Sequence, residues 1–325
     1  MNHGDVFLLS LTSKRAFRML KSSNRREIVK ITCSNKDDIT FQVEMEENKS
    51  QVIVVCKENK NEEAERNNEK VQMNGKVFEI CRMENMTFIL YYEEFEKYEI
   101  TEAIFERVNT IFGRNKPFVL ISFDDQFLPK FHGITETRIS MCWSVKASRL
   151  EEYFEAVAVQ DLVEMKFWRV KIKKESKFFH AKVLEIQDSS DLGLEILLHF
   201  KGREAYLLYS LQNEDSNVIN FLKRWKCKEA FQDLEILELL GFEAESFDRI
   251  EQETNVKRFP NQVNLPITIL KNSFGRYNTD PTRISTYIVR SDGIVAFIVI
   301  NNEMFLFHVQ KFTEKQMIES GYSMG

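Results

Sequence analysis

The stretch from Lys182 to Leu240 decides the fold class, and it reads KVLEIQDSSDLGLEILLHFKGREAYLLYSLQNEDSNVINFLKRWKCKEAFQDLEILELL. Its short apolar runs predict three strands, over Ala181–Ile186, Glu204–Tyr209 and Leu234–Leu240. Helical spacing predicts one helix after each of the first two strands, and the first begins in the cap-forming cluster at 188–191. The second helix carries its apolar residues at i, i+3, i+4 and i+7, namely Val218, Phe221, Leu222 and Trp225.

A strand–helix unit that recurs about every 20 to 30 residues is typical of a leucine-rich-repeat-like array. We therefore expect an α/β fold in which a leucine-rich-repeat-like strand–helix array is flanked by antiparallel β segments and preceded by a short N-terminal helix. Such an array typically provides an extended binding surface, and its fold alone does not indicate a catalytic centre.

Composition places the chain among soluble globular proteins with one large domain or two. It has 325 residues, of which 43% are hydrophobic and 29% charged, and a net charge of −5 that gives no general attraction to nucleic acid or to anionic membranes. No apolar run approaches the ~20 residues of a membrane helix. The five cysteines are odd in number and form no CxxC, which with the lack of a signal peptide predicts buried thiols and an intracellular, cytoplasmic or nuclear location. The two glycosylation sequons, at 48–50 and 85–87, are then chance matches.

The segments around the array read as β structure. Alternating and continuous apolar runs predict a β-rich antiparallel cap over 28–92, in which 58–69 is a solvated loop. The array covers 100–245. C-terminal β-hairpins cover 284–309, with a turn at Ser291-Asp292-Gly293. Between the array and the hairpins the apolar pattern is less regular. It predicts a short helix at 247–254 and a loop bracketed by Pro260 and Pro266.

The first half of the array is predicted from the same signals. A helix with Ile104, Val108 and Ile111 on one face ends near Gly113. Strands follow at 117–123, 138–143 and 163–170, and Ser148-Arg149-Leu150-Glu151 reads as a capping box that starts another helix. The basic run 171–177 favours a charged loop over a contact with phosphate or nucleic acid, because it lacks interleaved exposed aromatics.

No known catalytic or nucleotide-binding motif occurs in the sequence. Asp124 and Asp125 are adjacent carboxylates, but neighbours on a strand point apart, so a solvated strand end is favoured. The histidines are scattered, with none at metal-ligand spacing: His3, His132, His180, His199 and His308. We expect no enzyme activity, no metal and no cofactor, with a hydrolase site assembled only in three dimensions as the alternative.

The N-terminal stretch Asp5–Lys21 reads DVFLLSLTSKRAFRMLK, with apolar positions on one face and basic residues on the other. From periodicity alone it is an amphipathic helix that packs on the domain. The stretch also resembles the second half of an F-box as found in nematode proteins, a helical motif that docks proteins onto a cullin ubiquitin ligase through a small adaptor. The resemblance implies that the adaptor contacts are Phe7, Leu8, Leu11, Ser13, Lys14 and Arg15.

A second stretch, Asn220–Trp225 (NFLKRW), resembles the Phe-Leu-Lys-x-Trp element of the type-2 F-box-associated domain, and Leu234-Glu235-Ile236 matches the strand that follows it there. The family has Trp where this chain has Asp191, and its Arg-x-Asp-Gly hairpin corresponds to Arg290–Gly293. The resemblance implies partial F-box helices at 1–24 and an F-box-associated domain at 25–325, with the best match at 178–245.

This likeness implies a substrate-recruiting subunit of an SCF-type cullin ubiquitin ligase. Its partners would be the adaptor with its cullin complex and a target protein held by the array, with no nucleic acid and no membrane. The alternative is a non-catalytic protein-interaction module without ligase docking, because the chain begins within what corresponds to the second F-box helix.

Overall fold

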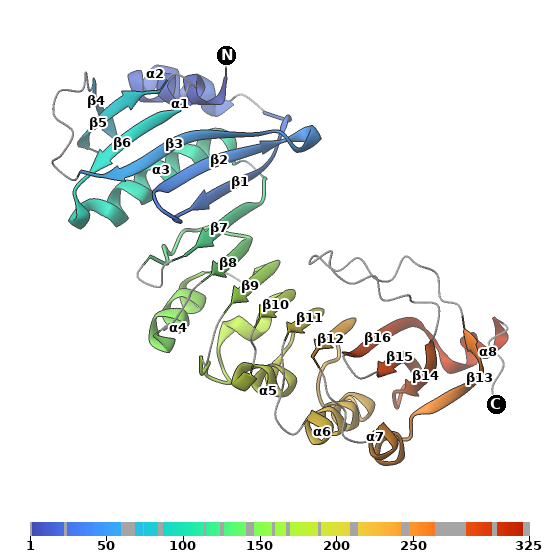
Figure 1. Ribbon diagram of the computed structural model, residues 1–325. Coiled ribbons are helices and arrows are strands. Elements are labelled where there is room, and N and C mark those ends of the chain that lie inside the picture. The colour runs from blue at the N-terminus through green and yellow to red at the C-terminus, as the bar shows by residue number, and fades with distance from the viewer. Residues whose placement is uncertain are drawn as a thin grey trace. The chain divides into compact units, whose positions relative to one another are not determined.

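The computed structural model describes residues 2–22, 25–59, 69–73, 75–83, 87–113, 115–123, 127–140, 146–157, 160–166, 170–187, 190–208, 214–241, 247–263, 284–300 and 304–320. Contacts divide the chain into two compact units, Met1–Glu164 (unit 1) and Met165–Gly325 (unit 2). Each unit has a mixed α/β fold (Figure 1). The predicted boundary between residues 24 and 25 rests on sequence likeness and stays a prediction.

Unit 2 contains the predicted strand–helix alternation. Three strands, β10 (Val183–Gln187), β11 (Glu204–Leu208) and β12 (Ile236–Leu240), pair in parallel. Helix α5 (Ser190–His199) connects the first pair and α6 (Glu214–Lys226) the second. The prediction from the apolar spacing is confirmed here in element type and order.

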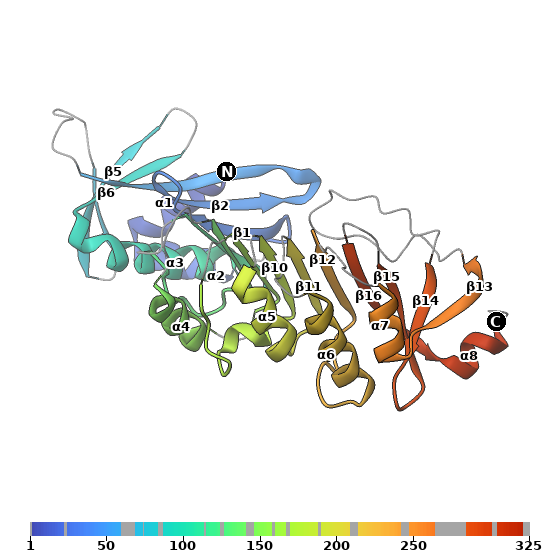
Figure 2. The same ribbon diagram turned by 60° about the horizontal axis from the view of Figure 1, so that its bottom comes forward.

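The second half of unit 2 extends this sheet in antiparallel fashion, in the order β13-β14-β15-β16-β12-β11-β10. The helices α5, α6 and α7 lie on the same side of these strands (Figure 2). The further elements of unit 2 are η3 (Lys177–His180), α7 (Phe247–Thr254), β13 (Lys257–Val263), β14 (Ile284–Val289), β15 (Ile294–Ile300), β16 (Met304–Thr313) and α8 (Glu314–Glu319).

The predicted hairpins at 284–309 are confirmed, and Gly293 adopts the positive φ of 88° that their turn requires. The expected loop between Pro260 and Pro266 is wrong for its first part, because β13 includes Pro260 and continues to Val263, whereas 264–266 lie outside the described residues. An edge strand tolerates proline, since it needs hydrogen-bond partners on one side only. Strand β13 pairs only with β14 among the described strands, and it therefore accommodates Pro260.

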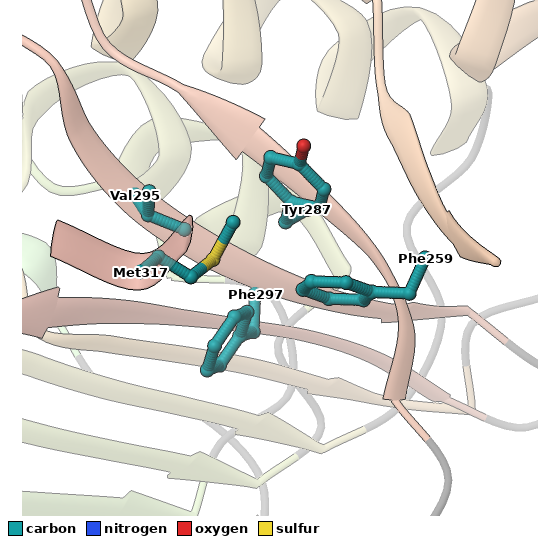
Figure 3. Close-up of a cluster of buried hydrophobic side chains, with 5 residues drawn as sticks. All are labelled: Phe259, Tyr287, Val295, Phe297 and Met317. Atoms are coloured by element: carbon teal, nitrogen blue, oxygen red, sulfur yellow. The ribbon is translucent and has the colours of Figure 1, made fainter. Parts of the chain in front are cut away.

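Helix α8 covers a hydrophobic cluster in unit 2. Met317 from α8 lies against Val295 and Phe297 of β15, with Tyr287 and Phe259 beside them (Figure 3). The Phe259 and Tyr287 rings are 4.7 Å apart between centroids. The side chain of Thr313 and that of Gln316 form a capping box that starts α8.

Unit 1 is built on a sheet ordered β8-β7-β1-β2-β3-β6-β5-β4. The expected cap over 28–92 is present but not wholly antiparallel, because β3 pairs with β6 in parallel, as β7 does with β1 and β8. Its strands are β1 (Ile28–Ser34), β2 (Ile39–Met45), β3 (Ser50–Glu58), β4 (Glu69–Met73), β5 (Lys76–Arg82), β6 (Phe88–Tyr92), β7 (Phe118–Ser122) and β8 (Glu136–Ser140).

The helical elements of unit 1 are α1 (His3–Thr12), α2 (Lys14–Ser22), η1 (Glu46–Asn48), η2 (Glu94–Glu96), α3 (Lys97–Phe112) and α4 (Ala147–Ala156). One short N-terminal helix was expected, and two are found. Helices α1 and α3 contact each other, and both contact the sheet. Strand β9 (Leu162–Lys166) spans the boundary between the units and covers the first part of the predicted strand at 163–170, of which 167–169 lie outside the described residues.

The predicted capping box at Ser148 is wrong. Helix α4 begins at Ala147, two residues before the start that a cap at Ser148 requires, so Ser148 lies inside its first turn and the N-cap residue is Lys146, whose side chain makes no capping hydrogen bond. The carbonyl of Lys146 accepts the Arg149 N–H at 2.9 Å, which fixes this earlier start. The first amides of α4 are thus left without a side-chain acceptor from the N-cap.

The expectation of buried thiols holds in part. Cys33 and Cys56 are buried, and burial raises the pKa of both thiols above the ordinary value. Cys81 is half-buried and Cys227 is exposed, so the expectation is wrong for Cys227. Cys142 lies outside the described residues, as do Asp124 and Asp125. None of the helices in the described part of the chain combines the length and apolar character that crossing a bilayer requires.

Candidate protein-binding surfaces

The N-terminal helix pair is shaped by two local caps. Asn2 Oδ1 accepts the Asp5 N–H at 2.8 Å and starts α1. Ser13 interrupts the helix with an extended backbone, and its Oγ accepts the Ala16 N–H at 3.0 Å, which starts α2. The sequence therefore encodes two helices because Ser13 serves as the C-cap of one and the cap of the next.

The predicted adaptor contacts fall into two groups on this pair. Phe7 is fully buried in unit 1, and Leu8 and Leu11 are half-buried. Ser13, Lys14 and Arg15 are exposed at the start of α2. Phe7 is thus packed inside unit 1, whereas the other predicted contacts retain accessible surface.

The accessible face of α2 is basic and carries one large apolar side chain. Met19 is 66% exposed. The exposed cations of the helix are Lys14, Arg15, Arg18 and Lys21. An exposed apolar side chain surrounded by cations is suited to binding an acidic protein surface. The cations attract an acidic partner and speed its association, and they repel basic proteins that could compete. We call this face, Lys14–Lys21, the basic helix face.

Arg107 anchors the pair to helix α3. Its guanidinium donates to the Ser10 carbonyl at 3.2 Å and lies over the Phe17 ring at 4.0 Å. Partial burial lowers the pKa of the Arg107 guanidinium from its ordinary value. The basic helix face is thus presented on a braced element and not on a loose terminus.

The stretch Phe221–Trp225 in α6 has a packing role. Phe221, Leu222 and Trp225 are buried, and the Phe307 ring of β16 lies 5.1 Å from Phe221 and 5.0 Å from Trp225. The other two residues of the stretch reach the neighbouring helices. Lys223 Nζ pairs with Glu253 of α7 at 2.7 Å, and Arg224 donates to the Leu198 carbonyl of α5 at 2.9 Å.

The hairpin Arg290–Gly293 contacts that same stretch. Arg290 donates twice to the Asp292 carboxylate, at 3.0 and 3.1 Å, and its guanidinium lies 5.2 Å from the Trp225 ring centre. Lys228 also pairs with Asp292 at 3.2 Å, and together these cations and the Ile294 amide hold the pKa of Asp292 well below its ordinary value. The two stretches that carry the family resemblance in unit 2 therefore form one structural contact.

A row of polar side chains crosses the face of the unit 2 sheet opposite α5 and α6. Glu185, Tyr206 and Glu238 occupy neighbouring register positions on β10, β11 and β12, and the two carboxylates are only 2% and 3% exposed. The Tyr206 hydroxyl donates to Glu204 Oε2 at 2.8 Å. Burial first, and then the surrounding carboxylates, raise the pKa of Tyr206, so its phenol stays protonated.

The sequence does not predict this buried row, because alternation along a strand does not tell whether its second face is covered. A signal was nevertheless present. Leu184-Glu185-Ile186 and Leu237-Glu238-Leu239 place a carboxylate at the same position of corresponding strands. In parallel strands of matched register, equivalent positions line up across the sheet. Here Glu185 and Glu238 both line up with Tyr206, which lies on β11 between their strands.

His308 lies on β16 opposite Ile236, near the end of the row. Burial lowers its pKa, and nearby Glu235 opposes that shift. Glu235 itself accepts two hydrogen bonds from Arg203, at 3.2 and 2.8 Å, and these bonds lower the pKa of Glu235. The fold thus favours the neutral form of His308, and its Nδ1 lies 2.9 Å from the Gln310 amide nitrogen.

Lowering the pH from 7.5 to 5.5 is expected to destabilise unit 2. The folded pKa of His308 lies below the ordinary value of 6.5, and the same holds for His180, where burial and two lysines lower it. The unfolded chain therefore binds protons first as the pH falls through 6.5, so stability declines until the folded pKa is reached. Thermal unfolding at both pH values, with His308→Gln and His180→Gln, tests this. An unchanged pH slope in the double variant would contradict the assignment.

Within the described residues no group of three or more His, Cys, Asp or Glu side chains is placed to hold a metal ion. Comparison with known proteins finds no matching family model, no matching curated protein and no matching solved structure.

Proposed function

We propose that the chain is a substrate-recruiting subunit of an SCF-type cullin ubiquitin ligase. The basic helix face contacts the adaptor, and the strand–helix array holds the target protein. The proposal begins from the resemblance of Asp5–Lys21 to an F-box and of Asn220–Trp225 to the type-2 F-box-associated domain.

The observation that supports it most directly is the accessible start of α2. Ser13, Lys14 and Arg15, half of the residues that the resemblance assigns to the adaptor, are exposed beside Met19. Arg107 braces the pair through the Ser10 carbonyl and the Phe17 ring. A braced basic surface suits a docking role, because little conformational entropy is lost when it binds.

We propose further that β10, β11 and β12 with α5 and α6 are leucine-rich-repeat-like. Each repeat supplies one strand and one helix, and the strands pair in parallel. In such arrays the sheet face opposite the helices is a common partner surface. That face here carries side chains that stay partly exposed around the buried row, among them Glu204 and His308.

One observation favours the alternative, an interaction module that does not dock on a ligase. Phe7 is fully buried, and Leu8 and Leu11 are half-buried, so the apolar part of the predicted adaptor contact is largely used within unit 1. In that case the array still binds its partner, and the basic helix face serves unit 1 alone.

Co-purification with the adaptor separates the two. The tagged full chain is co-expressed with the adaptor of an SCF-type ligase, and adaptor retention is measured at low and high salt. We expect retention by the natural chain, a decrease of about tenfold or more in Lys14→Glu/Arg15→Glu, and weaker retention at high salt.

The matched control is Lys171→Glu/Lys174→Glu, which changes the net charge equally on exposed residues of unit 2. It should retain the adaptor as the natural chain does. Equal loss in both variants would mean that the binding is a general charge effect and would overturn the docking site. Absence of retention by the natural chain, with its fold intact by circular dichroism, would overturn the ligase role.

A further inference from the structure

Helix α1 is fastened to unit 1 at both of its ends. Near its C-terminal end, Arg107 of α3 donates to the Ser10 carbonyl at 3.2 Å. At its N-terminal end, the side chain of His3 reaches Gln51 of the sheet, and His3 is only 8% exposed. Histidine is the side chain that changes its charge between about pH 5 and 8. The N-terminal fastening of α1 therefore includes a side chain of the kind that senses pH.

Both ring nitrogens of His3 lie next to oxygen acceptors. Nδ1 is 3.1 Å from Gln51 Oε1 of β3, and Nε2 is 3.5 Å from Oε1 of Glu27, the residue directly before β1. The orientation of the Gln51 amide is fixed independently, because the His3 backbone N–H donates to the same Oε1 at 3.3 Å. A backbone N–H can only donate, so the atom that faces Nδ1 is the amide oxygen and not the amide nitrogen.

A neutral imidazole cannot satisfy both of these neighbours. It carries one N–H group, and its second nitrogen has a lone pair that faces an oxygen lone pair in this arrangement. The imidazolium carries a proton on each nitrogen, and it also places a positive charge beside the Glu27 carboxylate. The surroundings of His3 are therefore fully matched only by the protonated ring.

Glu27 and Arg25 are the charged groups that the described contacts place around the His3 ring. A backbone hydrogen bond first, and then His3 and Arg25, hold the pKa of the Glu27 carboxyl below its ordinary value. Arg25 Nη1 lies 3.8 Å from Glu27 Oε1, so its charge opposes a second cation at that oxygen. It reduces the attraction without replacing it, because His3 Nε2 lies closer to the oxygen. From α3, the uncharged Phe112 ring meets His3 edge-on at 5.8 Å between centroids.

We propose that His3 is a proton-dependent latch that holds helix α1 on unit 1 more tightly as the pH falls. Protonation adds the attraction to Glu27 in the docked helix alone, so proton uptake and docking favour each other. Opening of the latch frees the helix end that precedes the fully buried Val6 and Phe7, and it loosens α2, which packs on α1. The latch acts within unit 1, and the inference does not require ligase docking.

Hydrogen exchange of the α1 amides in the full chain tests the latch. Exchange is measured at pH 6 and at pH 8, and each rate is divided by the rate of an unstructured chain at the same pH, which removes the general effect of pH on exchange. We expect the protection of the α1 amides to be about threefold or more higher at pH 6, the scale of a partly exposed ion pair. Equal protection at the two pH values would overturn the inference.

Two variants locate the effect. Glu27→Gln puts an amide beside Nε2, and an amide can donate to the neutral ring or accept from the protonated one, so the difference between pH 6 and pH 8 should disappear. His3→Gln removes the titrating ring and should abolish the difference as well. If His3→Gln leaves α1 unprotected at both pH values, Glu27→Gln still decides, because it keeps His3 and its contact with Gln51. A pH effect of natural size in Glu27→Gln contradicts the latch.

Asp5→Asn is the matched control on the same helix. The Asp5 carboxylate pairs with Arg82 of β5 at 3.0 Å, and this contact to the sheet involves no histidine. Its loss should lower the protection of α1 by a similar factor at pH 6 and pH 8, so the ratio between the two stays that of the natural chain. A ratio that falls as far in Asp5→Asn as in Glu27→Gln would mean that any charged contact of α1 produces the pH effect, and the role assigned to His3 would be wrong.

Discussion

Replacing Trp225 by alanine is expected to lower the free energy of unfolding of unit 2 by about 3 to 5 kcal/mol, the range for deleting a large buried aromatic side chain. Trp225 is fully buried. Its ring contacts Phe307 of β16, and Arg290 of the β14–β15 turn lies over it at 5.2 Å. Loss of the ring would therefore loosen α6 from the sheet and from the turn at once.

Urea unfolding followed by far-ultraviolet circular dichroism measures this loss. Trp225→Phe is the matched control, because it keeps a ring against Phe307 and beneath Arg290. The indole nitrogen of Trp225 has no hydrogen-bond partner among the described residues, so phenylalanine gives up no such bond. We expect the phenylalanine variant to lose clearly less stability than the alanine variant. If Trp225→Ala unfolds at the urea concentration of the natural chain, the packing role assigned to the stretch Phe221–Trp225 is wrong.

Replacing Phe7 by alanine should have a comparable effect on unit 1, again about 3 to 5 kcal/mol. Phe7 and Val6 are fully buried where α1 meets the sheet and α3. Hydrogen exchange of the α1 and α2 amides, read alongside urea unfolding, shows whether the helix pair detaches alone or the whole unit opens. Lys14→Ala, on the exposed start of α2, should change stability by no more than about 0.5 kcal/mol.

Undisturbed hydrogen exchange in Phe7→Ala would show that Phe7 does not hold α1 in place. The expected outcome also bears on the ligase proposal. If Phe7→Ala unfolds α1, then loss of adaptor binding in that variant says nothing about a direct contact. The surface cations Lys14 and Arg15 are the informative positions, because they can be changed without disturbing the core.

The strand–helix alternation of unit 2 could be predicted because it is a local signal. Apolar spacing in Val218–Trp225 reports which face of α6 is buried, and the polar cluster before α5 reports where that helix starts. The expected hairpin turn at Asp292-Gly293 rests on an equally local requirement for positive φ. Each of these predictions needs only neighbouring residues.

Pairing partners could not be predicted in the same way. The parallel pairing of β3 with β6 joins strands that a hairpin, β4–β5, separates in the chain, and period-two alternation carries no information about a distant partner. Strand β13 differs from the loop that Pro260 and Pro266 predict, because an edge strand accommodates Pro260. The start of α4 at Ala147 depends on where Lys146 directs its carbonyl, which a capping pattern alone does not report.

Candidate sites were harder still to predict. The latch at the start of α1 is assembled from three segments that are separated in sequence, around His3, Glu27 and Gln51. For the N-terminal stretch, amphipathic spacing places Phe7 on the apolar side and Lys14 on the basic side. It does not tell whether the apolar side faces the protein's own core or a partner, because both are apolar environments.

The return of β16 to β12 has a consequence for synthesis. Strand β16 follows all the other described strands in the sequence, yet it pairs with β12, with Ile236 opposite His308 and Leu240 opposite Met304. As the chain leaves the ribosome, β12 is an open edge, and the aromatic face of α6 lacks Phe305 and Phe307 until that last strand arrives. A nascent or prematurely ended chain would display both an unpaired strand and an apolar helix, the features that chaperones and proteases recognise.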